Sequence, residues 1–184
     1  KITETSPTIP TSVYGSTKLT GEQYCKIYSN LFGINITALR PFNIYGPRQN
    51  DAYAGVISKF MDKLNENKSP IILGNGRQTR DFIHVDDVAR AFYLALKYYK
   101  KTFDVFNLAT GKSTTINELS EIFLLAANKP GLKAIHKKSI PGVVVHSSTN
   151  PKKIKQSLHF TPIISLRDGI TKFVKSQTFD SKKW

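Results

Sequence analysis

The chain has 184 residues, with 27 Lys and Arg against 13 Asp and Glu, so its formal net charge is +14. Hydrophobic residues make up 40% of the chain and charged residues 22%, which is typical of a folded protein and excludes a disordered or collagen-like chain. One compact domain of this length can bury roughly 70% of its unfolded surface, so a sizeable core is expected.

Helical and strand-like periods alternate along the chain, which predicts an α/β protein. Residues 1–11 are polar and carry two prolines, so we expect an extended lead-in there. In chain order we expect a helix at 12–32, a strand at 34–39 that stops at Pro41, a helix at 56–64, a strand at 71–73, a helix from Asp86 or Asp87, a strand at 105–108, a helix after Thr115, and helices at 151–158 and 166–176.

Polar residues at helix ends support these boundaries. The predicted signals are Ser12 and Gly33 at the two ends of the first helix, a capping box of Thr115 and Glu118, Asn150 ahead of Pro151, and Ser165 three residues ahead of Asp168. The helix that begins at Asp86 or Asp87 is expected to bury the face formed by Val88, Phe92, Ala95, Leu96 and Tyr99.

The sharpest local feature for chemistry is the pair Tyr14 and Lys18. Residues four apart on a helix share one face, so the phenol and the ammonium can lie in one site. A nearby ammonium favours a phenolate, and a phenolate can take a proton from an alcohol. The alternative is that Lys18 pairs with Glu22, also four residues away, while Tyr14 only packs.

Three segments in this order extend the pattern. They are Pro10-Thr11-Ser12-Val13-Tyr14-Gly15-Ser16-Thr17-Lys18, Leu39-Arg40-Pro41-Phe42-Asn43-Ile44-Tyr45-Gly46-Pro47-Arg48-Gln49, and Gly74-Asn75-Gly76-Arg77-Gln78-Thr79-Arg80-Asp81-Phe82-Ile83-His84-Val85-Asp86-Asp87. As a set they resemble the extended short-chain dehydrogenase/reductase family, within it the NAD-dependent nucleotide-sugar epimerases and dehydratases, and above all the UDP-glucose and UDP-N-acetylglucosamine 4-epimerases. The resemblance covers nearly the whole chain.

The resemblance implies catalytic roles for Tyr14, as the acid/base, and for Lys18. It also implies that both residues contact the cofactor, with Lys18 binding the nicotinamide ribose of NAD. Such enzymes remove the 4-OH proton while hydride passes from C4 to NAD, rotate the keto sugar, and return the hydride to its other face. Pro41 would lie near the cofactor, and Asn43 would donate to the substrate diphosphate. The alternative for Asn43 is that its amide satisfies backbone groups of a turn.

The resemblance also implies substrate contacts farther along. Val56 and Leu73 match positions that line the uracil and ribose pocket, although their periodicity alone suggests core residues. Arg80 matches a diphosphate-binding arginine, and a guanidinium suits phosphate oxygens. A salt bridge from Arg80 to Asp81 is the alternative. His84 is expected to support its loop and is not assigned to the site, and no metal site is expected.

Two departures from the family pattern matter. An arginine is expected just before a Pro-Gly-Asp, but this chain has Ile140 followed by Pro141, Gly142 and Val143. No Gly-rich dinucleotide fingerprint occurs in the chain, and only 13 residues precede Tyr14, too few to include the family's catalytic Ser or Thr. The resemblance therefore implies the C-terminal part of a longer enzyme, inactive without its N-terminal half.

In that reading residues 1–50 are a remnant of the NAD-binding Rossmann domain. Residues 51–184 are mostly a nucleotide-sugar-binding domain, with short segments at about 80–110 returning to the Rossmann part. The family commonly dimerises through the tyrosine-bearing helix, so a homodimer is expected, with Tyr24, Ile27, Tyr28 and Leu31 and the helix at 56–64 supplying the surface.

Alternatives stay open at this point. A nucleotide-sugar 4,6-dehydratase or decarboxylase would belong to the same family. A basic module that binds nucleic acid would use the net positive charge, but the lysines are scattered and no nucleic-acid motif occurs. A non-catalytic module that binds a nucleotide sugar or a partner helix would explain the departure at Ile140.

Cellular location is indicated by cysteine usage and hydropathy. The one cysteine, Cys25, excludes an internal disulfide and favours a reducing compartment. No apolar run approaches the roughly 20 residues that span a bilayer, and the chain opens on no signal peptide. We therefore expect a cytoplasmic protein that does not bind membranes.

Overall fold

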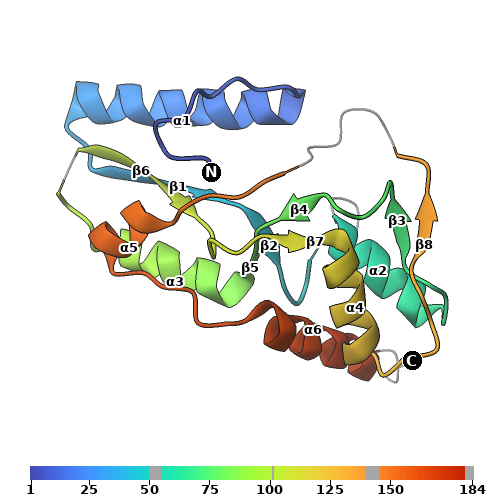
Figure 1. The fold of residues 1–184 in the computed structure, drawn as a ribbon. Helices are drawn as coiled ribbons and strands as arrows, with labels where there is room; N and C mark the ends of the chain where they lie inside the picture. The colour runs from blue at the N-terminus through green and yellow to red at the C-terminus, as the bar shows by residue number, and fades with distance from the viewer. Residues whose placement is uncertain (50–54, 101, 140–145, 181–184) are drawn as a thin grey trace.

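The computed structural model describes residues 1–49, 55–100, 102–139 and 146–180. Helices and strands alternate, which confirms the α/β class (Figure 1). In chain order they are α1 (Val13–Phe32), β1 (Ile36–Pro41), β2 (Asn43–Tyr45), α2 (Val56–Asn65), β3 (Ile71–Leu73), β4 (Thr79–Arg80), β5 (Phe82–His84), α3 (Val85–Ala95), β6 (Phe103–Leu108), β7 (Thr114–Thr115), α4 (Ile116–Ala126), β8 (Ile135–Lys137), α5 (Lys152–Leu158) and α6 (Leu166–Asp180).

The described strands form four pairs. β1 and β6 run parallel, with Ile36 opposite Phe103 and Pro41 opposite Leu108. β2 pairs with β5 and β3 with β8, both in parallel, whereas β4 and β7 are antiparallel. Parallel strands need crossover connections, which accounts for the helices between them.

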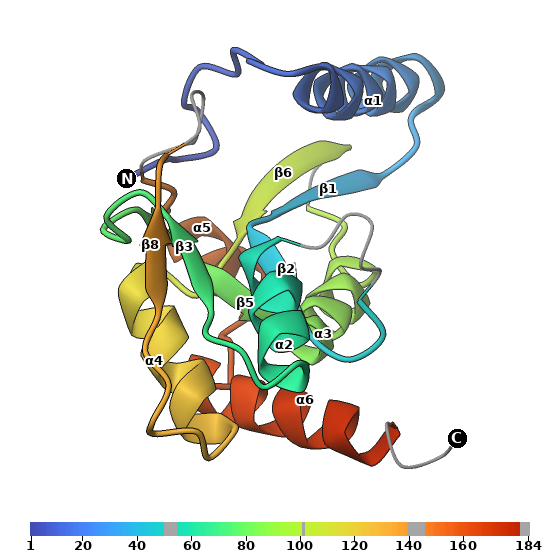
Figure 2. The ribbon, with the colours of Figure 1, turned by 90° about the vertical axis from the view of Figure 1, so that its right-hand side faces the viewer.

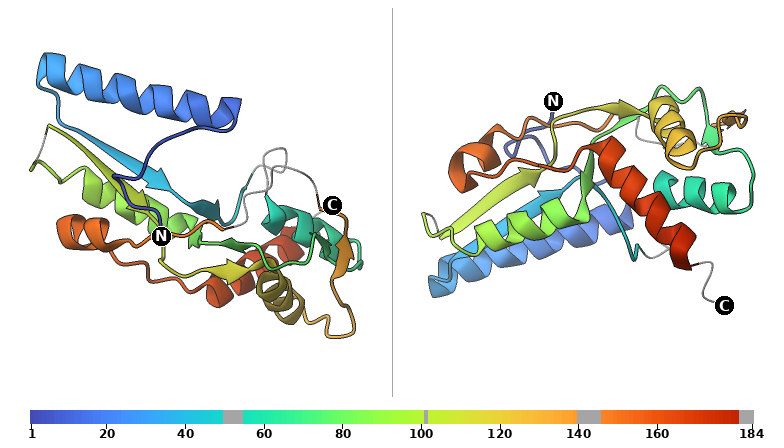
Figure 3. Two further views of the ribbon diagram at one scale, coloured as in Figure 1. Left: turned by 45° about the horizontal axis from the view of Figure 1, so that its top comes forward. Right: turned by 90° about the horizontal axis from the view of Figure 1, so that it is seen from below.

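Helices cover both faces of the β1–β6 pair. α1 lies across one face and contacts both strands, and α3 lies on the other face (Figures 2 and 3). Two buried apolar clusters form the core. One joins β2, α2, β3, α4 and α6 around Phe60 and Phe123, and the other joins β5, α3, β6 and α5 around Phe106 and Ile154.

Most predicted helix ends are confirmed. The Ser12 hydroxyl accepts from the Gly15 N–H, and Gly33 ends α1 with a left-handed φ of 66°. Thr115 and Glu118 form the predicted capping box at α4. Ser165 accepts from the Asp168 N–H at the start of α6. These helix ends depend on residues close together in the sequence, so they can be predicted without knowledge of the tertiary structure.

The first predicted strand is shifted. It begins at Ile36 rather than residue 34, and it includes Pro41 instead of stopping before it. Proline is tolerated because its missing N–H falls on the side of β1 that faces away from β6. β6 likewise starts at Phe103, two residues before its predicted beginning.

The predicted start and inner face of α3 are partly wrong. His84, not Asp86 or Asp87, is the cap, and its Nδ1 accepts from the Asp86 N–H at 3.2 Å. Val88 and Ala95 are buried as expected. The other three predicted inner residues are exposed, namely Phe92, Leu96 and Tyr99.

Other boundaries and surfaces also differ. α5 begins at Lys152 with Pro151 as its cap, so Asn150 does not cap it. The short strands β2, β4, β5, β7 and β8 were not separately predicted. The prediction that α2 supplies a dimer surface is wrong, because its apolar side is buried against α4 and α6.

Candidate active site

A cavity of about 490 Å³ opens where β1 ends, beside the start of α1. Its lining includes three of the predicted site residues, Tyr14, Pro41 and Asn43. Ligands in α/β proteins commonly bind at the carboxyl ends of parallel strands. The structure therefore brings the predicted acid/base, the predicted cofactor neighbour and the predicted diphosphate donor to one place.

Tyr14 and Lys18 are one helical turn apart on α1. Tyr14 is 72% exposed, and the Lys18 Nζ lies 5.2 Å from the centroid of its ring. Glu22 does not form an ion pair with Lys18. Its carboxylate instead accepts from Arg40 Nε and Nη2, at 2.7 and 2.6 Å. The alternative in which Lys18 pairs with Glu22 is therefore not the arrangement in the structure.

The same spacing occurs a second time, on α3. Tyr93 and Lys97 are also four apart, with a hydrogen bond of 2.7 Å between Lys97 Nζ and Tyr93 Oη. That hydrogen bond, together with the charge of Lys97, lowers the pKa of Tyr93. Neither residue lines either of the two cavities described here. The four-residue spacing is therefore sufficient to bring a phenol and an ammonium together. What distinguishes Tyr14 from Tyr93 is that Tyr14 lines a cavity.

Asn43 is held at the start of β2. Its Nδ2 donates to the Asp81 carbonyl at 2.9 Å, and its backbone N–H donates to the same oxygen at 3.1 Å. This contact agrees with the alternative in which the Asn43 amide satisfies a backbone group. An amide nitrogen carries two hydrogens, so one donor of Asn43 is left for a ligand in the cavity.

Arg80 is half-buried on β4. Its Nη1 donates to the Thr79 carbonyl at 2.8 Å, and burial lowers its pKa. The predicted alternative, a salt bridge to Asp81, does not form. The Asp81 carboxylate instead accepts from the Thr110 N–H and hydroxyl and from the Gly111 N–H, at 2.7 to 2.9 Å. Within the described ranges Arg80 has no carboxylate partner, which suits a residue that receives an anion.

The two remaining predicted substrate residues lie apart from Tyr14. Leu73 lines a second cavity of about 340 Å³, together with Arg77 and His146. Val56 is half-buried at the start of α2 and packs against the first apolar cluster, so it lines neither cavity. The stretch from Ile140 to Val143 falls outside the described residues.

Sequence reasoning missed six polar residues that line the Tyr14 cavity. Three come from the N-terminal segment, Thr3, Ser6 and Thr8, and the others are Arg40, Asn107 and Ser147. Asn107 carried a usable signal, because a buried amide interrupts the apolar run of β6. Its Nδ2 donates to the Thr149 hydroxyl at 3.2 Å. Ser147 carried none, since its position depends on an extended segment that returns to β4.

The described residues contain no group of three or more His, Cys, Asp or Glu able to hold a metal ion. None of the described helices has the length and apolar character required to cross a membrane.

Comparison with known proteins agrees with this geometry. Residues 1–109 match the NAD dependent epimerase/dehydratase family. The chain belongs to this family. The resemblance drawn from the three motif segments is thereby confirmed.

Several relatives carry the names of nucleotide-sugar 4-epimerases. A putative UDP-glucose 4-epimerase of Methanocaldococcus jannaschii is 42% identical over 174 residues, which are 94% of this chain and 55% of that protein. A UDP-glucose 4-epimerase of Thermotoga maritima, solved with UDP-glucose, superposes with a TM-score of 0.88 at 31% identity, covering 95% of this chain and 56% of that one.

A UDP-glucuronic acid 4-epimerase of Bacillus cereus was solved with UDP-glucuronic acid and NAD. It has a TM-score of 0.83 and 31% identity, and the match covers 96% of this chain and 56% of that one. This family member therefore spans about half the length of the relatives it matches.

Proposed function

We propose that this chain is the C-terminal part of an NAD-dependent UDP-hexose 4-epimerase. The observation that carries the proposal is the cavity at the carboxyl end of β1, where Tyr14, with Lys18 beside its ring, meets Pro41 and Asn43. The named 4-epimerases among the similar proteins support the choice of reaction.

In the proposed reaction, Tyr14 Oη acts as the general base that takes the proton from the sugar 4-OH and later returns it. Lys18, beside the Tyr14 ring, binds the ribose next to the nicotinamide. Asn43 donates to the substrate diphosphate, and Arg80 binds the same group from β4. Leu73 contacts the nucleoside from the second cavity, and the same contact is assigned to Val56, which lines neither cavity, on the family resemblance alone. NAD, when bound, supplies the reversible hydride acceptor that these residues lack.

The residues present fit one end of NAD. Tyr14 and Pro41 line an open cavity with polar groups, as the nicotinamide ribose requires, and Lys18 lies beside the Tyr14 ring. The sequence contains no Gly-rich fingerprint for the pyrophosphate. We therefore assign the pyrophosphate to an N-terminal half outside this chain, and we expect the chain alone to be inactive.

The domain and subunit assignments follow from this proposal. Residues 1–50 belong to the NAD-binding domain, and 51–184 mostly to the nucleotide-sugar domain, with about 80–110 returning to the first. The exposed apolar side of α1, formed by Tyr24, Ile27, Tyr28 and Leu31, supports a homodimer through this helix.

The test is a chimera in which this chain follows the part of the Methanocaldococcus relative that precedes its matched segment. We expect the chimera to interconvert UDP-glucose and UDP-galactose with NAD, measured by chromatography of the sugar nucleotides. A Tyr14→Phe chimera is the matched control and should bind UDP without turnover. A 4-keto-6-deoxy product, or turnover that survives Tyr14→Phe, would contradict the proposal.

A further inference from the structure

Residues 2–8 form one wall of the Tyr14 cavity, although they lie outside the helices and strands. The lining residues from this segment are Ile2, Thr3, Ser6, Pro7 and Thr8. Segments without regular secondary structure are mobile unless specific contacts tie them down. The contacts that hold this wall therefore determine the shape of the cavity.

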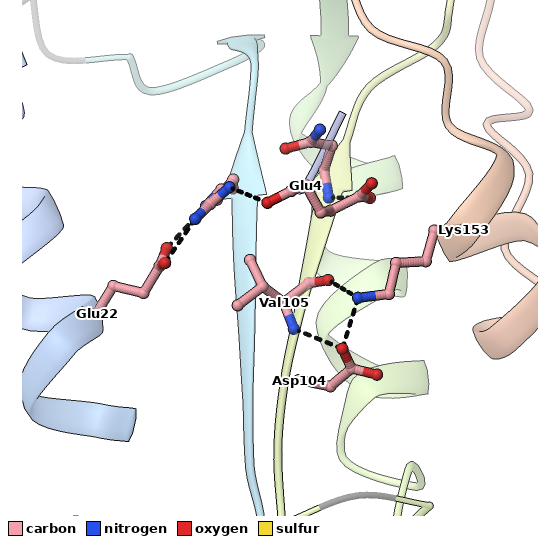
Figure 4. A network of polar contacts seen from close by, with 7 residues as sticks. Glu4, Glu22, Asp104, Val105 and Lys153 are labelled. Atoms are coloured by element: carbon pink, nitrogen blue, oxygen red, sulfur yellow. Dashed lines mark hydrogen bonds and ion pairs between the residues drawn. The ribbon is translucent and has the colours of Figure 1, made fainter. Parts of the chain in front are cut away.

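Glu4 ties the wall to both strands of the β1–β6 pair (Figure 4). Its Oε1 accepts from the Asn107 N–H of β6 at 2.9 Å, and its backbone carbonyl accepts from Arg40 Nη1 of β1 at 3.3 Å. Asn107 is 2% exposed, so without this acceptor its N–H would be a buried and unpaired donor. The strand pair thus favours a carboxylate at the position that Glu4 takes.

A second anchor lies two residues earlier, at Ile2. The Ile2 N–H donates to the Ser148 carbonyl at 3.0 Å, and its carbonyl accepts from the Thr149 hydroxyl. The same Thr149 hydroxyl accepts from Asn107 Nδ2 at 3.2 Å. Asn107 is therefore joined to the wall twice, directly through Glu4 and indirectly through Thr149.

The wall turns just after Glu4 and presents hydroxyl-bearing residues to the cavity. The Thr3 N–H donates to Ser6 Oγ at 2.9 Å, and the Ser6 N–H donates to the Thr3 carbonyl at 3.1 Å. Thr3, Ser6 and Thr8 all line the cavity. A hydroxyl both donates and accepts, so this wall suits a ligand that is itself rich in hydroxyls.

The position of the wall relates it to one part of the proposed substrate. In the proposed reaction Tyr14 contacts the sugar 4-OH and Asn43 contacts the diphosphate, and both residues line this cavity. The hexose, which joins these two groups, then lies in the cavity that residues 2–8 enclose. The nucleoside is assigned to the second cavity, which residues 2–8 do not line.

We propose that Glu4 is a positioning residue that holds residues 2–8 against the hexose of the substrate. The inference rests on the proposed function in taking a nucleotide hexose as the ligand. Glu4 does not itself line the cavity, so it acts through the wall that it anchors. Its loss should weaken the binding of the hexose and leave the binding of the nucleotide unchanged.

The test measures the affinity of the chimera for UDP-glucose and for UDP by calorimetry, in the Tyr14→Phe form so that no substrate is converted. Glu4→Ala removes the acceptor of the Asn107 N–H, whereas Glu4→Gln keeps an oxygen acceptor on a side chain of similar shape. We expect Glu4→Ala to bind UDP-glucose about tenfold more weakly and UDP within about twofold of the unmodified affinity. Glu4→Gln should restore most of the UDP-glucose affinity. Glu121→Ala, an exposed carboxylate on α4, is the matched control and should change neither affinity.

Amide hydrogen exchange in the chimera reports on the anchor and the wall separately. The Asn107 amide should lose protection in Glu4→Ala and keep it in Glu4→Gln. The Val105 amide, which donates to Asp104 Oδ1 at 2.9 Å, should stay protected in both and shows that β6 remains folded. With Glu4 intact, the amides of residues 2–8 should exchange more slowly with UDP-glucose bound than with UDP bound. This last comparison needs no Glu4 variant, so it decides the matter if Glu4→Ala does not fold.

Equal losses of UDP and UDP-glucose affinity in Glu4→Ala, or no loss of either, would overturn the inference. Equal exchange of residues 2–8 with the two ligands would also overturn it. An active chimera in which Glu4→Ala leaves UDP-glucose affinity unchanged would reject this inference alone. A selective loss of UDP-glucose affinity in a chimera that is inactive even with Tyr14 would reject the proposed reaction and leave the role of Glu4 standing.

Discussion

The guanidinium of Arg40 donates two hydrogen bonds to the carboxylate of Glu22, which ties the middle of α1 to β1. The hydrogen bond to Glu22 raises the pKa of Arg40. Lys18 and Glu22 are four residues apart on the same helix, so the carboxylate is also within reach of the lysine. By occupying Glu22, Arg40 leaves the Lys18 ammonium beside the Tyr14 ring.

Replacing Arg40 should therefore lower activity through a residue it does not touch. In an Arg40→Gln chimera, the freed Glu22 attracts Lys18 away from Tyr14, and we expect kcat to fall about tenfold. The double variant Arg40→Gln/Glu22→Gln removes the competing carboxylate and should recover most of the loss. Steady-state kinetics of both variants checks this; equal losses in both would show that Arg40 does not act through the position of Lys18.

The two Tyr-x-x-x-Lys pairs offer an internal comparison. Tyr14→Phe removes the proton acceptor at the cavity, and we expect kcat to fall by about 10² to 10⁴. Tyr93→Phe removes the same group from α3, where no described cavity exists, and should leave kcat within twofold. A comparable loss in the Tyr93 variant would mean that α3 affects turnover by a route the cavity does not explain.

Arg80→Gln should have effects of opposite sign on binding and on stability. Without its guanidinium the chimera should bind UDP about tenfold more weakly, measured by calorimetry. The half-buried cation has no carboxylate partner among the described residues, so its removal should raise the urea midpoint of the ligand-free chain. Arg167→Gln, on the exposed side of α6, is the control for a general loss of positive charge. Unchanged UDP affinity would remove Arg80 from the binding site.

The buried Asp104 should give the fold an acid-dependent component. Burial raises its pKa, but hydrogen bonds from Lys153, Tyr98 and the Val105 N–H outweigh burial, and the net pKa lies below the ordinary value. Such a carboxylate stabilises the fold above about pH 4, and this stabilisation is lost as pH falls through the lowered pKa.

Asp104→Asn is expected to destabilise the chain by about 2 kcal/mol at pH 7 and to flatten the decline in acid. Urea midpoints measured from pH 2.5 to 7 check both effects. Asp62→Asn, an exposed carboxylate on α2, is the matched control. If the pH profile of the Asp104→Asn variant matched that of the unmodified chain, protonation of Asp104 would not be the cause of the decline in acid.

Gly169 and Gly21 are predicted to respond oppositely to alanine. A Cβ at Gly169 would collide with the Tyr45 hydroxyl, so Gly169→Ala should destabilise the chain by about 1–3 kcal/mol. Nothing lies within 4 Å of a Cβ at Gly21, inside α1, so Gly21→Ala should stabilise it by about 0.5–1 kcal/mol. Thermal unfolding of both variants checks the signs, and a stabilised Gly169 variant would mean that α6 shifts freely.

Sequence predicted the structure well where neighbours along the chain decide it. Ser12 caps α1 through an N–H three residues away, and Tyr14 meets Lys18 through helical spacing alone. The start of α3 was misassigned because Asp87 is used elsewhere. Its carboxylate accepts from the N–H groups of Ile163 and Ile164, at 3.0 to 3.2 Å, which the local sequence does not reveal.

The candidate site shows the same division. Motif positions predicted Tyr14, Pro41 and Asn43, and these share one cavity. Ser147 joins them through long-range pairing, which no local period encodes. The exposed side of α3 was misassigned as inner because its apolar residues follow helical spacing, yet the described chain provides nothing to cover them.

His146 and Ser147 are consecutive, yet they line different cavities. They belong to an extended segment that bridges β4 at Thr79, and successive side chains of extended backbone point in opposite directions. A ligand in the first cavity would contact Ser147, and a ligand in the second would contact His146. The two cavities are therefore separated by one stretch of backbone, which Thr79 anchors through its pairing with His146.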